Sequence, residues 1–278
     1  MLDKTADKAY ANPRHDEAGY YALADLPQRE SVAEIAMSTG WWELDQIFKL
    51  YPGQFVVVTG IPGHGKSTLL LNIICNLWAQ KVKSFLYVPE NEGHIREKLA
   101  LMWNSTNLEF DIFSEIGCFV QCSVPDTFDQ IPHTLDWLLN KAATAVERDG
   151  VKILLIDPWN EIEHAKPPMM AMTDYIRQCI MWIKQFCRMY SVTVIMVAHP
   201  TKAGVVDGKI PTLSDIEGSM SWYNKCDNGL IVARDPSNNS CKVISAKVRE
   251  IGAGKRGSCF FQVDPHTGKF TPEMGAVT

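Results

Sequence analysis

Residues 55–68 read Phe-Val-Val-Val-Thr-Gly-Ile-Pro-Gly-His-Gly-Lys-Ser-Thr. The first four are aromatic or β-branched and follow the Pro52-Gly53 turn, as a buried parallel strand would. Apolar residues then recur at helical spacing, at Leu70, Leu71, Ile74, Leu77 and Trp78. A strand that feeds a glycine-rich loop and then a helix is the arrangement that cradles phosphate groups. We therefore expect a nucleotide-binding loop between this strand and this helix.

The loop itself matches Gly-x-x-x-x-Gly-Lys-[Ser/Thr] and predicts a nucleotide triphosphatase. Its glycines let the backbone turn tightly, so that N–H groups face an anion. Lys66 would reach the β and γ phosphates, and the Ser67 hydroxyl would bind Mg²⁺. ATP or another nucleoside triphosphate is the expected substrate. The candidate nucleotide-binding residues are Gly60, Pro62, Gly63, His64, Gly65, Lys66, Ser67 and Thr68.

Composition is that of an ordinary globular protein: 278 residues, 46% hydrophobic and 21% charged. No apolar stretch is long enough to span a bilayer, and no secretory signal follows Met1, so we expect a cytoplasmic protein without a membrane partner. The eight cysteines lack paired metal-binding spacing and are expected to be free thiols, with no metal site beyond Mg²⁺. A net charge of −5 argues against coating nucleic acid by bulk positive charge. It leaves open a ring that holds DNA only in a central channel.

The chain divides by pattern into a polar arm or linker, residues 1–38, and one domain over residues 39–278. In the domain, apolar strands alternate with amphipathic helices, which predicts an α/β fold with a mostly parallel sheet flanked by helices. We expect strands at 55–59, 84–88, 117–121, 151–156 and 191–198, and helices at 66–80, 93–104, 130–148 and 170–189.

The pattern changes after Pro200. Residues 200–213 are rich in Gly and Pro and predict a long functional loop. A short helix is expected at 214–224, followed by a C-terminal antiparallel extension of the sheet. Its strands are expected at 229–234, 240–249 and 257–263.

Asp157 ends the aliphatic strand 151–156 and would emerge at the carboxyl edge of the sheet, where ligands bind in such folds. This is a Walker B arrangement. The Asp157 carboxylate would hold Mg²⁺ through its water shell, opposite Ser67. A strand-ending turn aspartate before Pro158 is the alternative interpretation.

With these residues in place, the chain resembles the RecA-like helicase domains of the DnaB type, in particular phage primase-helicases and Twinkle helicases. The resemblance runs from about Thr39 to the end of the chain. Six motifs carry it, in this order: Thr-Gly-Ile-Pro-Gly-His-Gly-Lys-Ser-Thr (59–68), Val-Pro-Glu-Asn (88–91), Leu-Ile-Asp-Pro-Trp-Asn-Glu (155–161), Val-Ala-His-Pro-Thr-Lys (197–202), Gly-Ser-Met-Ser-Trp-Tyr-Asn-Lys-Cys-Asp-Asn (218–228) and Lys-Val-Arg (247–249).

The resemblance implies a RecA-like P-loop ATPase that forms a ring, with a hexamer as the expected homo-oligomer. It implies a DNA helicase that moves along single-stranded DNA in the 5′ to 3′ direction, at a site of DNA replication and with a primase or other replication protein as partner. No primase or zinc-binding domain is expected in residues 1–38. That arm is instead a candidate linker between protomers, with Tyr20, Tyr21 and Leu23 as docking residues.

Two catalytic residues on one protomer follow from the resemblance. Glu90 matches the acidic residue that positions the attacking water, although Glu92 and Glu161 are rival candidates. His199 matches the position of a γ-phosphate sensor. The alternatives without a catalytic role are that Glu90 is a charged residue at the start of a helix, near the positive end of its dipole, and that His199 is an ordinary histidine at the end of a strand.

Four basic residues complete the expected site. Lys247 and Arg249 alternate along a strand, so both side chains point to one face, and in the resembled family this pair reaches into the neighbour's nucleotide. A solvated basic strand edge is the alternative. Lys202 and Lys209 lie in the 200–213 loop, which corresponds to the family's loop for single-stranded DNA. A mere flexible insertion is the alternative there.

Two other functions remain open from sequence. One is a RecA-like recombinase or loader ATPase that binds DNA without unwinding it. The other is a regulatory oligomer that uses ATP mainly to assemble. Unwinding of a forked duplex separates the helicase from the recombinase, and DNA-stimulated hydrolysis separates both from the regulator.

Overall fold

The computed structural model describes residues 30–103, 118–120, 133–202, 204–205, 209–218, 220–235, 237–273 and 277. Within these ranges the strands form one mixed sheet in the order β3-β2-β4-β5-β1-β6-β7-β8-β9. The strands from β3 to β6 in this order are parallel, and β7, β8 and β9 continue the sheet with antiparallel pairing. The expected parallel sheet with a C-terminal antiparallel extension is confirmed. The strands are β1 (Phe55–Thr59), β2 (Ser84–Tyr87), β3 (Cys118–Val120), β4 (Ile153–Ile156), β5 (Thr193–Val197), β6 (Asn228–Asp235), β7 (Ser240–Val248), β8 (Gly257–Val263) and β9 (Phe270–Pro272).

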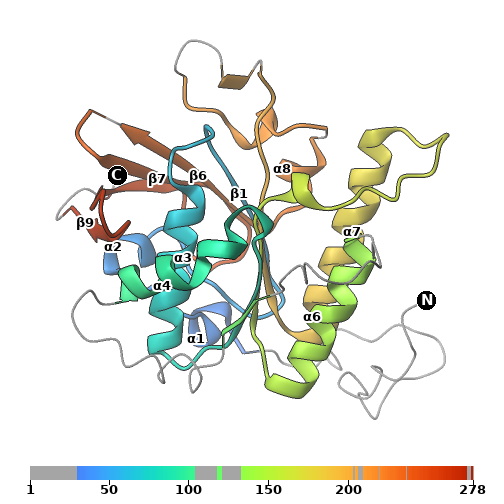
Figure 1. Ribbon diagram of the computed structural model, residues 1–278, viewed down its shortest axis with the longest axis horizontal. Helices are drawn as coiled ribbons and strands as arrows, with labels where there is room; N and C mark the ends of the chain where they lie inside the picture. Colours follow the sequence, from blue (N-terminus) through green and yellow to red (C-terminus); the bar gives the residue numbers. More distant parts are fainter. Residues whose placement is uncertain are drawn as a thin grey trace.

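Helices cover both faces of the sheet (Figure 1). On one face lie α2, α3 and α4, and on the other lie α6 and α7. The α-helices are α1 (Val32–Ile35), α2 (Trp42–Asp45), α3 (Lys66–Ala79), α4 (Ile95–Trp103), α6 (Leu135–Asp149), α7 (Met172–Tyr190) and α8 (Ser221–Lys225). The 3₁₀ helices are η3 (Pro89–His94), η4 (Trp159–Glu161) and η6 (Leu213–Asp215).

The sheet separates two hydrophobic clusters. Val56 and Val58 pack into the cluster on the α3 side, whereas Phe55 and Val57 pack into the cluster on the α6–α7 side. Every residue of β1 is buried. A strand covered on both faces needs apolar side chains at every position, which explains why residues 55–58 show no alternation with polar residues.

Some element boundaries differ from the expectations. The helix expected at 93–104 begins earlier, because η3 starts at Pro89 and continues into α4. The single helix expected at 214–224 is wrong: η6 and α8 are separate, with Gly218 between them at φ +89°. Helix α6 starts only at Leu135, where the Thr134 side chain accepts a hydrogen bond from the backbone of Trp137. Strand β9 was not expected.

The expectation of free thiols is confirmed for the six cysteines whose side chains are described, and all six are buried. Cys118 and Cys122 lie outside the described side chains. Among the described residues no cluster of three or more His, Cys, Asp or Glu residues could hold a metal ion. Their helices include none with the length and apolar character needed to cross a membrane.

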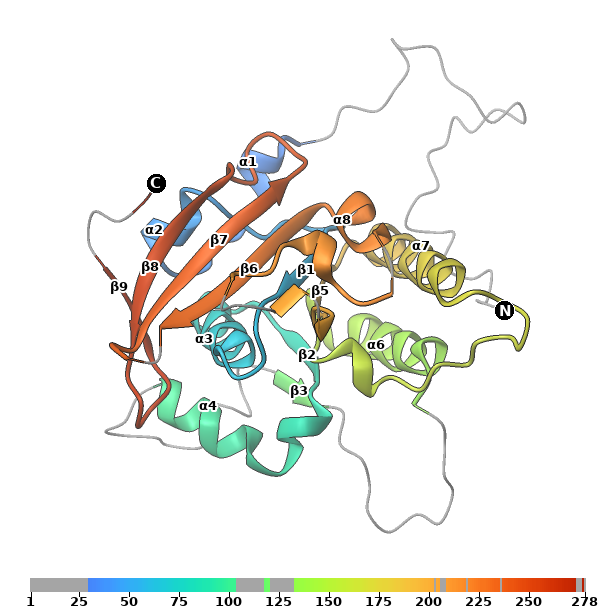
Figure 2. The same ribbon diagram turned by 90° about the horizontal axis from the view of Figure 1, so that it is seen from above.

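One row of paired residues crosses the sheet from β2 to β7, and Figure 2 shows these strands as parts of one sheet. From β2 to β7 the row reads Tyr87, Ile156, Met196, Val57, Gly229 and Lys247. Because the first five strands are parallel, the chain leaves each of them toward the same edge of the sheet. Strand β7 runs the other way, so residues after Lys247 move toward the opposite edge. This row fixes the layout of the functional residues.

Candidate nucleotide site

The glycine loop leaves the carboxyl end of β1 and enters α3 at Lys66. Gly60, Gly63 and Gly65 have φ values of +147°, +79° and +86°, which glycine adopts without the steric cost that a side chain brings. Gly60 also lies against β6, because a Cβ there would come within 2.1 Å of the Val232 carbonyl oxygen. The loop therefore requires glycine at position 60 for two independent reasons.

Lys66 is buried inside this loop, with only 5% of its surface exposed. Its Nζ donates hydrogen bonds to the carbonyl oxygens of Gly60 at 3.0 Å and Ile61 at 3.1 Å. Burial lowers the pKa of Lys66, while the charges of Asp157 and Glu90 act to raise it. The structure thus holds the Lys66 side chain inside the loop that leads into the N-terminus of α3, which is where an anionic phosphate binds in such loops.

Asp157 follows β4 and lies beside Ser67, whose hydroxyl makes a hydrogen bond to the carboxylate. Its side chain is nearly fully buried, and among the described residues Oδ2 has no hydrogen-bond partner. Burial raises the pKa of Asp157 to about 6; the Ser67 bond and the Lys66 charge lower it, whereas the Glu90 charge raises it further. The peptide bond to Pro158 is cis.

The Asp157 and Ser67 side chains fit a magnesium ion. A hydroxyl and a carboxylate are the hard oxygen donors that Mg²⁺ prefers. The free Oδ2 atom is a buried acceptor next to the phosphate loop, so a cation there would satisfy it.

The structure distinguishes the rival carboxylates by their neighbours. Glu90 lies in η3 after β2 and is exposed, and its charge acts on both Lys66 and Asp157. Glu161 lies in η4, and its charge acts instead on His199. The side chain of Glu92 is outside the described part of the chain. Of the two described candidates, only Glu90 therefore acts electrostatically on both Lys66 and Asp157.

His199 follows β5 and is half-buried. Burial lowers its pKa and the Lys66 charge lowers it further, against the opposing charges of Glu161 and Glu217. Its buried Nδ1 has no hydrogen-bond partner among the described residues. The imidazole is therefore favoured in its neutral form and has an unused polar atom near the phosphate loop.

The 200–213 loop begins at this histidine. The His199 carbonyl accepts a hydrogen bond from Glu217 N at 3.1 Å, and Pro200 pairs with Ile216 in an isolated antiparallel bridge. These contacts close the base of the loop. Lys202 and Lys209 are both exposed, and residues 203 and 206–208 lie outside the described structure.

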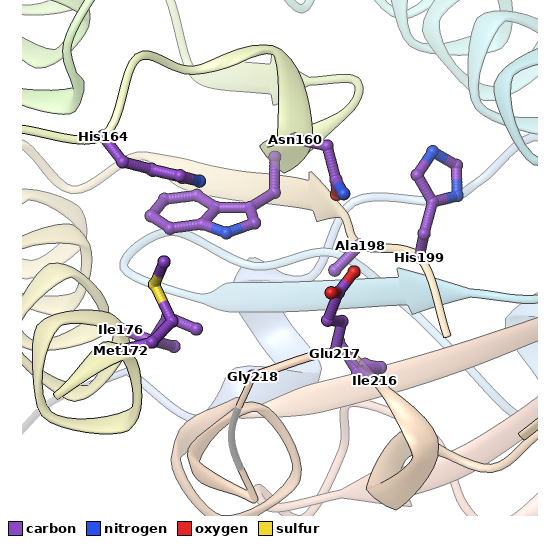
Figure 3. Close-up of a pocket in the computed structure, with 10 residues that line it drawn as sticks. Asn160, His164, Met172, Ile176, Ala198, His199, Ile216, Glu217 and Gly218 are labelled. Atoms are coloured by element: carbon purple, nitrogen blue, oxygen red, sulfur yellow. The ribbon is translucent and has the colours of Figure 1, made fainter. Parts of the chain in front are cut away.

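A cavity of about 290 Å³ lies between the base of this loop and the segment that follows β4. Figure 3 shows His164 and Met172 on one side of it and Asn160, His199 and Glu217 on the other. The remaining lining residues are Trp159, Ile176, Ala198, Ile216 and Gly218. The His199 side chain therefore lines an open space next to the base of the loop.

Lys247, near the end of β7, and Arg249, just after it, both contact the end of α8. Lys247 Nζ donates to the carbonyl oxygens of Tyr223 and Asn224, and Arg249 donates to the Asn224 carbonyl at 3.3 Å. The prediction that the two side chains share a face is confirmed. Because Lys247 pairs with Gly229 in the row that contains Val57, Arg249 lies level with the start of β1 rather than with the phosphate loop.

Asp227 holds Arg249 in place, and sequence reasoning did not identify it. It is 7% exposed, and its carboxylate accepts from Phe55 N at 2.9 Å and pairs with Lys184 and with Arg249 at 3.3 Å. The signal was an acidic residue two positions before the strand predicted at 229–234. The partner Lys184, on α7, is 43 positions away, so no local pattern connects the two.

Comparison with known proteins places this geometry in a family. The KaiC ATPase family matches residues 37–210. The Twinkle homolog protein of Arabidopsis thaliana is 35% identical over 266 residues, which cover 86% of this chain and 36% of that protein. The DNA repair protein RadA of Haemophilus influenzae is 26% identical over 236 residues, covering 82% of this chain and 47% of that protein. The chain thus spans between a third and a half of the length of these curated relatives.

The fold also matches a solved structure of a DnaB-like replicative helicase, determined to study its interactions with primase. The TM-score is 0.66 at 20% sequence identity, and the match covers 84% of this chain and 61% of that chain. At this identity the match concerns the fold, and the RecA-like ATPase fold expected from the sequence is confirmed.

The buried Asp157 makes a testable prediction about stability and pH. A carboxyl whose folded pKa is raised from 3.8 to about 6 is stabilising when protonated, and this contribution is lost as the pH rises through 6. Without nucleotide and magnesium, Asp157→Asn should therefore raise the free energy of unfolding at pH 8 by roughly 1–3 kcal/mol. This gain corresponds to a melting temperature that is higher by a few degrees. The gain should shrink as the pH falls from 6 toward 4, and ATP turnover should fall at least about a hundredfold.

Asp174→Asn is the matched control, because Asp174 is exposed on α7 and, within the described part of the chain, forms a salt bridge with the exposed Arg177 alone. It should change both melting temperature and turnover little. An Asp157→Asn protein that melts below the wild type at pH 8, or that turns over ATP normally, would contradict the assignment.

Proposed function

The chain belongs to the KaiC family of ATPases, and from that membership we propose that it is the motor domain of a ring-forming, ATP-dependent DNA helicase. The observation that carries the proposal is the separation of Arg249 from the phosphate loop of its own subunit. Arg249 is level with Phe55, and Gly60 comes five residues later, so the two differ by roughly 16 Å along the strand direction. A site completed by Arg249 needs a second copy of the chain.

On this proposal each nucleotide lies between two protomers. One protomer supplies the phosphate loop, and its neighbour supplies Lys247 and Arg249. A guanidinium stabilises the charge that develops on the transferred phosphoryl group, an effect worth about 10³ or more in rate. Closed rings of identical subunits repeat such a head-to-tail interface at every boundary, and a hexamer is the proposed state.

Within one protomer the described side chains have distinct tasks. Lys66 neutralises and orients the phosphates, and Glu90 orients the attacking water and accepts its proton. Ser67 and Asp157 would hold Mg²⁺. When bound, that ion would neutralise phosphate charge during hydrolysis. Burial of Lys66 and Asp157 supports these assignments, because buried charges act strongly on a ligand from which water is excluded.

His199 is proposed to report hydrolysis to the 200–213 loop. Its imidazole is close enough to Lys66 for the two charges to interact, and its carbonyl is part of the base of the loop. A change in the hydrogen bonding of the ring can therefore move the loop through one residue. The cavity beside His199 supports this role, since it leaves room for the ring or the base of the loop to shift.

The exposed Lys202 and Lys209 are the proposed contacts to single-stranded DNA. Two lysines per subunit give weak binding, but six copies around a channel would place about a dozen charges along one strand. Movement 5′ to 3′, a primase or other replication partner, and a site of replication in the cytoplasm belong to the same proposal. The division into an arm, residues 1–38, and a motor domain, residues 39–278, is also part of it, with the arm linking protomers.

A RadA-type DNA repair ATPase is the second candidate, favoured by the RadA relative at 26% identity. It would share the phosphate loop and the DNA-dependent hydrolysis. It differs in the outcome, because it would remodel DNA strands without unwinding a fork by itself.

We expect single-stranded DNA to stimulate ATP hydrolysis, and a duplex with a 5′ single-stranded tail to be unwound. Replacing both Lys202 and Lys209 by Ala should abolish most of the stimulation and leave the DNA-free rate unchanged, because both side chains are exposed and neither is assigned a role in binding or hydrolysing the nucleotide. The matched control replaces the exposed Lys141 and Lys152 by Ala and should leave stimulation intact. Stimulation without unwinding would favour the RadA-type function. Hydrolysis indifferent to DNA would reject both.

Mixed oligomers test the shared site. Lys66→Ala and Arg249→Ala proteins should each lose at least about a hundredfold in turnover. In a random one-to-one mixture about a quarter of the interfaces combine an intact phosphate loop with an intact Arg249, so hydrolysis should recover toward that fraction. Co-assembly is checked by native mass spectrometry. Co-assembled mixtures that stay inactive at every ratio would count against a site made by two subunits.

A further inference from the structure

Strand β6 extends past the end of β1, beside the phosphate loop. The two strands pair only as far as Thr59 and Ile231, but β6 continues to Asp235. The Val232 backbone lies against Gly60. By the period of two along a strand, the backbone of Arg234 faces the same side. Its N–H would have no strand partner there, and an unpaired backbone donor is costly when it is shielded from water.

His64 supplies the missing acceptor. Its Nδ1 accepts the hydrogen bond of Arg234 N at 3.1 Å. The backbone N–H of His64 donates to the Ile61 carbonyl at 3.2 Å, which closes the turn inside the loop. The middle of the phosphate loop is therefore tied to β6 by one side chain, across 170 positions of sequence.

This contact requires a specific form of the imidazole. A neutral ring that accepts at Nδ1 carries its proton on Nε2, and a doubly protonated ring has no acceptor left. Burial lowers the pKa of His64, and the positive charges of Lys66 and Arg234 lower it further. The surroundings thus favour the neutral ring that the bond to Arg234 needs.

We propose that His64 is a positioning residue for nucleotide binding: it fastens the phosphate loop to β6 and so presets the loop before a nucleotide arrives. The proposal rests on the assignment of this loop as the nucleotide site. The Gly-x-x-x-x-Gly-Lys-[Ser/Thr] pattern leaves position 64 free, so the histidine is not required by the loop motif itself. Because the bond holds the loop and not the reacting atoms, its loss should weaken binding and leave the chemical step unchanged.

Three variants at this position separate the bond from other effects. Asn places its amide oxygen at the position of Nδ1 and can accept from Arg234, whereas Gln places its amide at the position of Nε2 and cannot. Ala removes the side chain. The dissociation constant for ADP with magnesium is measured by calorimetry, and kcat is measured at saturating ATP. His64→Gln and His64→Ala should bind ADP about three- to tenfold more weakly, whereas His64→Asn should stay within about twofold of wild type. All three should keep kcat within about twofold.

Each other outcome is decisive. The role of His64 would be overturned if the Asn, Gln and Ala variants all bound ADP with the same affinity. It would also be overturned if Gln and not Asn kept the wild-type affinity, or if kcat fell while the affinity for ADP stayed unchanged. A wild-type chain that binds no ADP would instead overturn the nucleotide site itself. Melting curves without nucleotide confirm that each variant folds, and a variant that does not is replaced by His64→Ser, which also lacks an acceptor at the Nδ1 position and should behave as Ala does.

Discussion

Parallel pairing of the strands around β1 is the constraint on which the site depends. Because β2, β4, β5 and β1 run in one direction and share one row, Glu90, Asp157, His199 and the phosphate loop all emerge at the same edge. Strand β7 runs the other way, so Arg249, which follows it, lies level with the start of β1 and away from the phosphate loop. On our proposal, one subunit therefore presents the two halves of a nucleotide site on two different surfaces. A ring is the arrangement that brings such halves together repeatedly.

Two buried aspartates mark these two surfaces and differ in how they are compensated. Asp227 is paired with two cations and a backbone N–H, so its burial holds α7, α8 and β7 against the start of β1. Asp157 has one carboxylate oxygen with no hydrogen-bond partner in the described ranges, and its pKa is raised to about 6. A buried carboxylate of the first kind stabilises a fold, because each charge has an opposite neighbour. A buried carboxylate that is only partly compensated, as at Asp157, destabilises the fold by itself and can hold a cation that binds beside it.

Local sequence was enough to predict the features that depend on local structure. The apolar run 55–58, the glycine loop and Asp157 at the end of 151–156 each carry their own pattern. The structure makes the run the inner strand β1 and places the loop and Asp157 at the carboxyl ends of β1 and β4. Contacts between distant segments could not be predicted in this way. The bond from His64 to Arg234 and the Asp227 pairs join residues with no common period, and the three-residue β9 is too short to show one. The helix expected at 214–224 failed because Gly218 turns the chain in its middle.

The central claim is that a single copy of this chain is catalytically incomplete. The most direct test measures ATP turnover per chain across a wide range of protein concentration, with particle mass followed in the same samples by sedimentation. Turnover per chain should rise with concentration and level off as the assembled form replaces the monomer. A turnover per chain that stays constant down to concentrations at which only monomers sediment would contradict it.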